Sequence, residues 1–130
     1  MLEIPASHRD LLNAPVAMLG TLGPDGFPQV TALWFLVVDD QIKISLNTSR
    51  QKVKNLRAHP ECSFFLLDPA NPYRTLEIRA RAHMADDPDK AFAKSLMTKY
   101  GDYDVTPNDR AHEQRVIVTL EPVKVNTWGG

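Results

Sequence analysis

Hydrophobic and polar residues alternate along much of the chain, as they do in β-strands that bury one face. Between residues 41 and 48, two isoleucines and a leucine alternate with Lys43, Ser45 and Asn47. A period of two places the apolar side chains on one face and leaves the other face wet or lining a site. By similar patterns, further strands are predicted at residues 16–22, 27–38, 62–67, 76–82, 115–120 and 123–128.

Two helices are predicted in the first half of the chain. Ser7 and Asp10 resemble a capping box and precede two leucines, which predicts a short first helix. A second helix is predicted over residues 50–58, with Ser49 as its cap. It ends ahead of Pro60, because a residue that precedes proline avoids the helical region.

A third helix is predicted over residues 89–100, where apolar side chains recur every four residues. Turns at 23–26 and 39–40 join the first strands, and the polar segment 102–108 is expected to be a loop. Six or seven strands with three short helices and no regular strand–helix alternation indicate a mainly antiparallel barrel of class α+β. Its own side chains fill such a barrel, so a large ligand is expected outside it or between two copies.

The composition predicts one domain spanning residues 1–130, because it shows no break along the chain. Fifteen Lys and Arg against 16 Asp and Glu give a net charge of -1, which disfavours nucleic acid as a partner. The longest apolar run, 33–38, is far shorter than the roughly 20 residues of a membrane helix, so no membrane partner is expected. With one cysteine and no signal pattern, we expect a soluble, cytoplasmic protein.

The most informative stretch for chemistry is residues 47–57, where four basic residues crowd the start of the second helix. The first turn of a helix has unpaired backbone N–H groups and a partial positive charge, and Arg50 and Lys52 add full charges. At about 100° per residue, Arg50, Lys54 and Arg57 share one sector while Lys52 points away. From spacing alone, an anion site and a solvated basic face are equally good interpretations.

A second candidate is the strand after the first turn, in which Gln29 and Thr31 share one face and Val30 and Ala32 the other. Its amide and hydroxyl groups could meet a flat heteroaromatic ring, although an ordinary core strand is the commoner source of this pattern. Trp128, near the end of the chain, is expected to dock on a neighbouring subunit's pocket, because large apolar residues at chain ends usually pack on something.

Hydrolytic and metal chemistry find little support in the sequence. The four histidines have no paired spacing and there is a single cysteine, so no metal site is expected. No serine lies in a nucleophile-elbow pattern, and the pair Asp86-Asp87 fits a turn and helix start better than a carboxylate dyad. No side chain is therefore predicted to be catalytic.

Four segments carry a resemblance to a known family. They are residues 20–31 with Trp34-Phe35; Arg50-Gln51-Lys52 with Asn55-Leu56 and Pro60; residues 68–74 running into 76–79; and Lys99-Tyr100-Gly101 followed by Arg115-Val116-Ile117. On these segments the sequence resembles the pyridoxamine-5'-phosphate-oxidase-like split-barrel superfamily. Within it, the chain is more closely similar to the actinobacterial deazaflavin (coenzyme F420)-dependent reductases.

The resemblance implies a homodimer of six-stranded antiparallel split β-barrels with short flanking helices and a cofactor groove along the subunit interface. Arg50 and Lys52 would bind the cofactor phosphate, supported by Asn55. We further expect Lys54 and Arg57 to bind the negatively charged glutamate tail of F420. The expected cofactor-binding residues are, beside the ring, Gln29, Val30, Thr31, Ala32 and Leu33; beside the linker, Ser45, Asn47 and Thr48; and elsewhere Arg50, Gln51, Lys52, Lys54, Asn55, Arg57 and Trp128.

The function implied by the resemblance is hydride transfer between reduced F420 and an electron-poor conjugated small molecule. Because the cofactor ring carries the hydride, the protein is left to position cofactor and acceptor and to keep water out. Two alternatives remain open. One is an FMN-binding split-barrel oxidase, and the other is a non-enzymatic protein that binds a flavin or a tetrapyrrole.

Overall fold

The computed structural model describes residues 3–101 and 106–129 of the chain. Within these residues seven strands form one sheet, and they are β1 (Ala17–Leu22), β2 (Pro28–Leu33), β3 (Leu36–Val38), β4 (Gln41–Asn47), β5 (Glu61–Asp68), β6 (Asn71–Asp86) and β7 (Arg115–Trp128). The helices are α1 (Gln51–Ala58) and α2 (Ala91–Met97), with the short 3-10 helices η1 (Ala6–Asn13), η2 (Pro88–Lys90), η3 (Thr98–Tyr100) and η4 (Thr106–Asn108).

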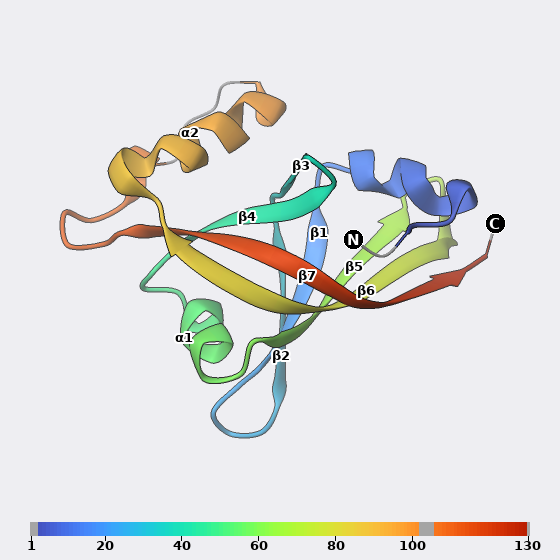
Figure 1. The fold of residues 1–130 in the computed structure, drawn as a ribbon, viewed down its shortest axis with the longest axis horizontal. Coiled ribbons are helices and arrows are strands. Elements are labelled where there is room, and N and C mark those ends of the chain that lie inside the picture. Colours follow the sequence, from blue (N-terminus) through green and yellow to red (C-terminus); the bar gives the residue numbers. More distant parts are fainter. Residues whose placement is uncertain (1–2, 102–105, 130) are drawn as a thin grey trace.

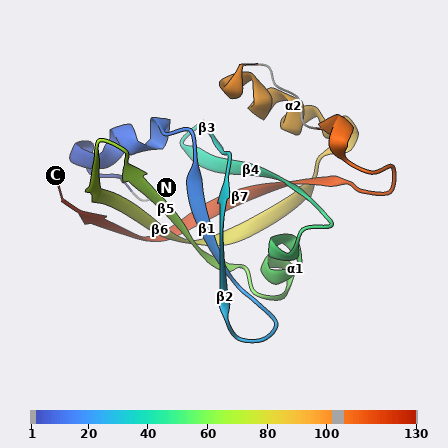
Figure 2. The same ribbon diagram turned by 180° about the vertical axis from the view of Figure 1, so that it is seen from behind.

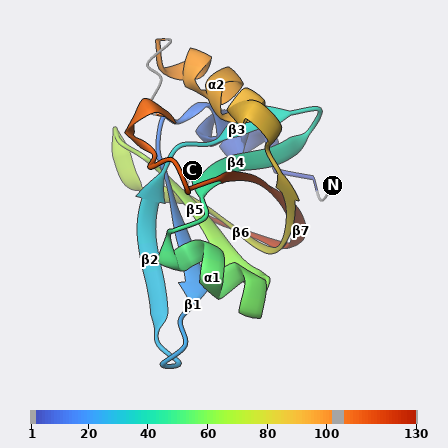
Figure 3. The same cartoon turned by 90° about the vertical axis from the view of Figure 1, so that its left-hand side faces the viewer.

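The sheet is antiparallel and curls on itself (Figure 1). Its strand order is β2-β1-β5-β6-β7-β4-β3, so the hairpins β1–β2 and β3–β4 lie at opposite edges. The long strands β6 and β7 form the middle of the sheet. Figure 3 shows the curled wall from the side, with α1 beside β1 and β2 and with α2 beyond β4.

Apolar side chains from alternate strand positions fill the inside of this curl. Ile42 and Ile44 of β4 are fully buried, which confirms the alternation read from the sequence. Phe35 and Phe64 are also fully buried and meet edge to face, with ring centroids 5.1 Å apart. Because the interior is filled in this way, the outer surfaces and edges are where a ligand can bind.

The prediction of a single strand at 27–38 is wrong, because the structure divides this segment into β2 and β3. The backbone leaves the sheet at Trp34 and Phe35, where contacts to η3 replace the strand ladder. The Phe35 N–H donates a hydrogen bond to the Tyr100 hydroxyl at 3.2 Å, and the Tyr100 ring stacks on Trp34 with centroids 4.0 Å apart. These contacts direct the chain from one edge of the sheet to the other.

The other predicted strands occur at the expected places, but the last ones are longer than predicted. Strand β6 begins at Asn71 instead of residue 76. The two strands predicted at 115–120 and 123–128 are one strand, β7, which continues through Pro122 with a shift of register against β6. Pairing with neighbouring strands extends β6 and β7 beyond the segments whose own alternation is clear.

All three predicted helices occur, but the first two are not capped as predicted. Ser7 and Asp10 form no capping box, and the Asp10 carboxylate instead binds the Arg74 guanidinium at 2.6 Å. Ser49 does not cap α1, because its N–H and hydroxyl both donate to the side-chain oxygen of Asn47. Asp10 thus binds a residue that is distant in the sequence, whereas Ser49 binds one that lies two residues before it.

The helix predicted over 89–100 is divided into η2, α2 and η3, because two residues at its start have φ of 58° and 57°. The Asp87 carboxylate accepts two backbone N–H groups of α2 at 2.9 Å. Of the predicted loop 102–108, residues 106–108 form η4 and residues 102–105 lie outside the described residues. Within the described residues, every helix is too short or too polar to cross a membrane.

Candidate functional site

The turn between β4 and α1 carries the predicted cationic segment, and hydrogen bonds fix its shape. Asn47 is buried at the end of β4, and its side-chain oxygen accepts the Ser49 N–H and hydroxyl, both at 2.9 Å. The Arg50 N–H donates to the Asn47 carbonyl at 3.1 Å. The backbone therefore holds Arg50 at the start of α1 while its side chain stays exposed to solvent.

Helix α1 lies against β1 and β2 (Figure 2). Side-chain hydrogen bonds attach the helix to these strands. Asn55 is only 2% exposed and donates to the Thr21 hydroxyl at 3.0 Å and to the Gln29 side-chain oxygen at 3.2 Å. The Lys52 ammonium donates to the Thr31 hydroxyl at 3.0 Å. Partial burial and, to a lesser degree, a neighbouring arginine lower the pKa of Lys52.

A pocket of about 190 Å³ opens between β2, β4, α2 and the start of α1. Five of the predicted residues line it, namely Leu33, Ser45, Asn47, Arg50 and Lys52. Its other lining residues are Trp34, Leu46, Leu96, Met97 and Arg115. The pocket joins cations and polar strand groups to an apolar wall, which is the combination that a ligand with a flat ring and an anionic group requires.

Ser45 contributes a polar group to this pocket that the fold does not satisfy. Its hydroxyl oxygen is buried and has no hydrogen-bond partner among the described residues. Leaving such a group unpaired costs about 1–3 kcal/mol, so a bound ligand or a water that pairs with it gains that interaction. The apolar wall from α2, Leu96 and Met97, was missed by sequence reasoning because nothing in the local pattern joins α2 to β2.

The residues predicted to run beside a ring divide between the two faces of β2. Gln29, Thr31 and Leu33 lie toward α1 and the pocket, whereas Val30 and Ala32 are exposed on the opposite face. Five consecutive side chains therefore cannot all face one ligand. However, β2 is an edge strand that pairs with β1 alone among the described strands, so the backbone groups along its outer edge are available.

The remaining predicted residues lie outside this pocket. The Thr48 hydroxyl accepts the Gln114 N–H, and the Gln51 amide donates to the Asn55 side-chain oxygen. Lys54 and Arg57 are exposed on the surface of α1. Trp128 is 72% exposed at the end of β7, on the far side of the molecule from α1 (Figure 1). Within one copy of the chain, the structure does not bring Trp128 to the other residues of the set.

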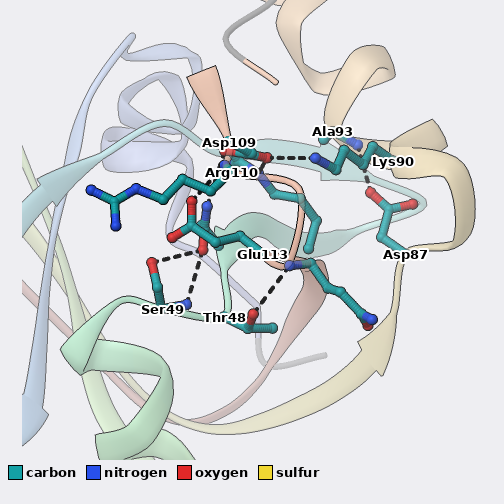
Figure 4. A network of polar contacts seen from close by, with 11 residues as sticks. Thr48, Ser49, Asp87, Lys90, Ala93, Asp109, Arg110 and Glu113 are labelled. Carbon is teal, nitrogen blue, oxygen red and sulfur yellow. Dashed lines mark hydrogen bonds and ion pairs between the residues drawn. The ribbon is translucent and has the colours of Figure 1, made fainter. Parts of the chain in front are cut away.

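An acidic residue next to the pocket, whose side chain is 5% exposed, was not predicted. The Asp109 carboxylate accepts two hydrogen bonds from Arg115, both at 2.9 Å, one from Lys90 at 3.1 Å and one from the Asn47 amide at 3.0 Å (Figure 4). These donors, with Arg115 first, hold the pKa of Asp109 well below its usual range. We call these four residues the Asp109 cluster. Through Asn47, it fixes the turn that precedes α1.

A second, apolar pocket of about 490 Å³ lies on the outer face of β1, β2, β5 and β6. Leu22, Val30 and Val123 line it and are 40%, 65% and 49% exposed. Cys62 also lines it, and burial raises the pKa of its thiol to about 12, so the thiol is unreactive at neutral pH. Exposed apolar side chains therefore gather on this face.

Comparison with known proteins gives this arrangement a family. A model of the family described as pyridoxamine 5'-phosphate oxidase matches residues 4–129. The chain belongs to this family. The resemblance read from the sequence is thereby confirmed, and so is the α+β, antiparallel split-barrel fold. The described residues form seven strands, whereas the resemblance implied six.

Solved structures include close matches to this member of the pyridoxamine 5'-phosphate oxidase family. A protein named F420 reductase shares 34% sequence identity, with a TM-score of 0.83, over 95% of this chain and 98% of its own. A conserved hypothetical protein of Mycobacterium tuberculosis shares 27% identity, with a TM-score of 0.77, over 98% and 86%. The haem-storage protein HutZ of Vibrio cholerae, at 14% identity and a TM-score of 0.76 over 98% and 96%, shares the fold alone. The search among curated proteins finds no match.

Proposed function

We propose that the chain is an F420-dependent oxidoreductase, which transfers a hydride between reduced F420 and an electron-poor conjugated small molecule. The observation that carries the proposal is the pocket at the start of α1, where Arg50 and Lys52 meet the end of β2 and an apolar wall. The 34% identity to a structure named F420 reductase, over nearly the whole of both chains, supports the choice of cofactor.

The side chains at the start of α1 suit a phosphodiester. Arg50 and Lys52 both line the pocket, and no described carboxylate forms an ion pair with either of them. A guanidinium and an ammonium at a helix start bind phosphate oxygens by charge-assisted hydrogen bonds. Asn55, held by two hydrogen bonds to the sheet, keeps α1 in place while these cations bind the ligand.

The edge of β2 and the apolar wall suit the ring. Leu33, Trp34 and Met97 form the apolar side, and the buried Ser45 hydroxyl can reorient toward a polar ring substituent. When bound, reduced F420 supplies the hydride from its own ring. The work of this chain is to hold ring and acceptor at near-attack distance and to exclude water, which needs no acid, base or metal ligand from the pocket.

The cofactor groove is completed in this proposal by a second copy of the chain. A pocket of about 190 Å³ is smaller than the roughly 300–1,000 Å³ of sites that enclose a ligand of this size. The apolar face around Val30 and Val123 is exposed beside β2, and Trp128 is exposed at the other end of the molecule. A homodimer through this face covers the apolar surface and adds a second wall along the β2 edge.

Titration of the purified protein with F420 and with FMN tests the assignment. We expect quenching or enhancement of F420 fluorescence with saturable binding, weaker binding of FMN, and a dimer by light scattering. FMN is the second candidate, because the same two cations suit its phosphate. A protein that is purified yellow with bound FMN, and that does not bind F420, would overturn the assignment.

The dimer is tested separately with Val30→Glu, which places a charge on the apolar outer face. We expect monomers of this variant, with the fold retained, because the Val30 side chain is 65% exposed in one copy. If this variant is still a dimer, the interface lies on another face. The cofactor assignment is then tested by the titration alone.

A further inference from the structure

A third pocket, of about 720 Å³, lies next to the proposed cofactor pocket and shares Arg50 with it. It opens between the start of α1 and the segment 108–115 that precedes β7. Its charged lining consists of Arg50, Arg110, His112, Asp109, Glu113 and Arg115. Because Arg50 belongs to both pockets, a ligand bound at the first can continue into the second.

The acidic residues of this pocket are already paired inside the protein. Asp109 binds Arg115 and Lys90, and the Glu113 carboxylate accepts the Arg110 backbone N–H at 2.7 Å. The neighbouring Ser49 side chain, first, and the Arg110 backbone N–H lower the pKa of Glu113. Neither carboxylate forms an ion pair with Arg50 or Arg110 in the described part of the chain.

The cations at the mouth of the pocket, in contrast to its carboxylates, have no partner among the described residues. The guanidinium groups of Arg50 and Arg110 make no hydrogen bond or ion pair with any described residue. In Figure 4 the Arg110 side chain extends away from the contacts of Asp109. Two unpaired guanidinium groups beside one polar pocket form a site for carboxylate or phosphate oxygens.

The walls of this pocket are fixed before any ligand binds. Asp109 attaches the segment 108–115 to Asn47, and a second attachment joins Thr48 to Gln114. There the Thr48 N–H donates to the Gln114 carbonyl at 2.9 Å, and the Gln114 N–H donates to the Thr48 hydroxyl at 3.2 Å. A site that is already ordered loses little conformational entropy when a ligand binds.

We propose that this pocket binds a second anionic part of the cofactor, the glutamate carboxylates of the F420 tail, through Arg50 and Arg110. The proposal rests on F420 as the ligand of the first pocket. It replaces Lys54 and Arg57 as the partners of the tail, because these two are exposed on α1 and line neither pocket. A ligand whose negative charge ends at a single phosphate, such as FMN, would not reach Arg110.

The test compares two forms of F420, one with its glutamate tail and one that lacks the glutamates. Dissociation constants are measured by fluorescence titration for the wild type and for Arg110→Gln, with Lys94→Gln on the exposed surface of α2 as the matched control. We expect the wild type to prefer the tailed form about two- to fivefold, the range of an exposed charge pair. Arg110→Gln should lose this preference and bind the short form as the wild type does, and Lys94→Gln should change neither value.

The outcomes distinguish failure of the tail site from failure of F420 as the ligand of the first pocket. If the wild type binds both forms equally well, or if Arg57→Gln removes the preference and Arg110→Gln does not, the tail site is wrong and F420 remains the ligand of the first pocket. If the wild type binds neither form, both assignments fail. Because the Arg110 side chain has no partner in the described structure, a folding defect in Arg110→Gln is not expected, and its melting temperature checks this.

Discussion

Two groups of charged side chains meet at Asn47, and they differ in whether their charges have partners. In the Asp109 cluster, the Asp109 and Arg115 side chains are 5% and 11% exposed and bind each other. At the start of α1, Arg50 is exposed without a partner among the described residues, and Lys52 contacts a hydroxyl. Charges paired away from water hold segments of the fold together, whereas unpaired cations on a fixed turn are left for an anion from outside.

Asn47 is the residue that connects the two groups. Its amide nitrogen donates to Asp109 and its side-chain oxygen accepts from Ser49, so this one side chain links the Asp109 cluster to the turn before α1. The Asp109 cluster thus holds the turn in the shape that presents Arg50. We therefore expect substitutions in the Asp109 cluster to alter stability and substitutions of Arg50 or Lys52 to alter ligand binding.

Removal of the Asp109 carboxylate is expected to have the largest effect. In Asp109→Ala, Arg115 and Lys90 lose their shared partner, so the free energy of unfolding should fall by about 2–4 kcal/mol. The expected loss is below that of a fully buried pair, because the Lys90 side chain is 28% exposed and can be hydrated. Urea unfolding followed by circular dichroism measures the change.

Asp86→Ala is the control for this experiment, because Asp86 is exposed at the end of β6. We expect its stability to stay within about 0.5 kcal/mol of the wild type. If the loss in Asp109→Ala were no larger than in the control, the Asp109 cluster would not hold the turn, and its paired charges would stabilise the fold no more than an exposed charge does.

Arg50→Ala is expected to have the second largest effect, and on affinity instead of stability. A hydrogen bond to a charged group contributes about 1.5–3 kcal/mol, so the dissociation constant for F420 should rise roughly ten- to hundredfold. The free energy of unfolding should hardly change, because the exposed guanidinium stabilises nothing in the described fold. Fluorescence titration and urea unfolding on the same preparation measure both quantities. An equal loss of stability with unchanged affinity would reverse the assignment.

The sequence was informative for strands and charged segments whose pattern is set by local neighbours. Ile42 and Ile44 alternate with polar residues because one face of β4 is buried, and a period of two records that directly. The cationic segment was visible for the same reason, since Arg50 and Lys52 are adjacent in the chain to the turn and the helix that present them.

Features that depend on distant partners were not predictable from the pattern. Asn47 and Asp109 are 62 residues apart, and no local periodicity relates them. The break at Phe35 has its cause in Tyr100, 65 residues further on, whereas the apolar residues around it read as one continuous strand. The capping role predicted for Ser49 was wrong for a local reason, because Asn47, two residues earlier at the end of the preceding strand, accepts both the N–H and the hydroxyl of Ser49.

The stability that the Asp109 cluster contributes should depend on pH, and this effect is expected to be smaller than those of Asp109→Ala and Arg50→Ala. The pKa of Asp109 is lowered in the folded state, so its contribution is present above the ordinary value of 3.8 and is lost as the pH falls toward the lower folded value. We therefore expect the stability difference between the wild type and Asp109→Asn to be constant from pH 7 to about pH 5 and to narrow toward pH 3. Urea unfolding at each pH measures it. A difference that does not change with pH would mean that the carboxylate charge contributes nothing.

Ser49→Ala has the smallest expected effect and tests the junction between the two groups. The variant loses the hydroxyl hydrogen bond to Asn47 and keeps the backbone one, so the free energy of unfolding should fall by about 0.5–1 kcal/mol. Because the Arg50 N–H still binds the Asn47 carbonyl, the dissociation constant for F420 should stay within about twofold of the wild type. A loss of affinity as large as that of Arg50→Ala, with little loss of stability, would show that the Ser49 hydroxyl binds the ligand itself, and the boundary between structural and ligand-binding groups would then include Ser49.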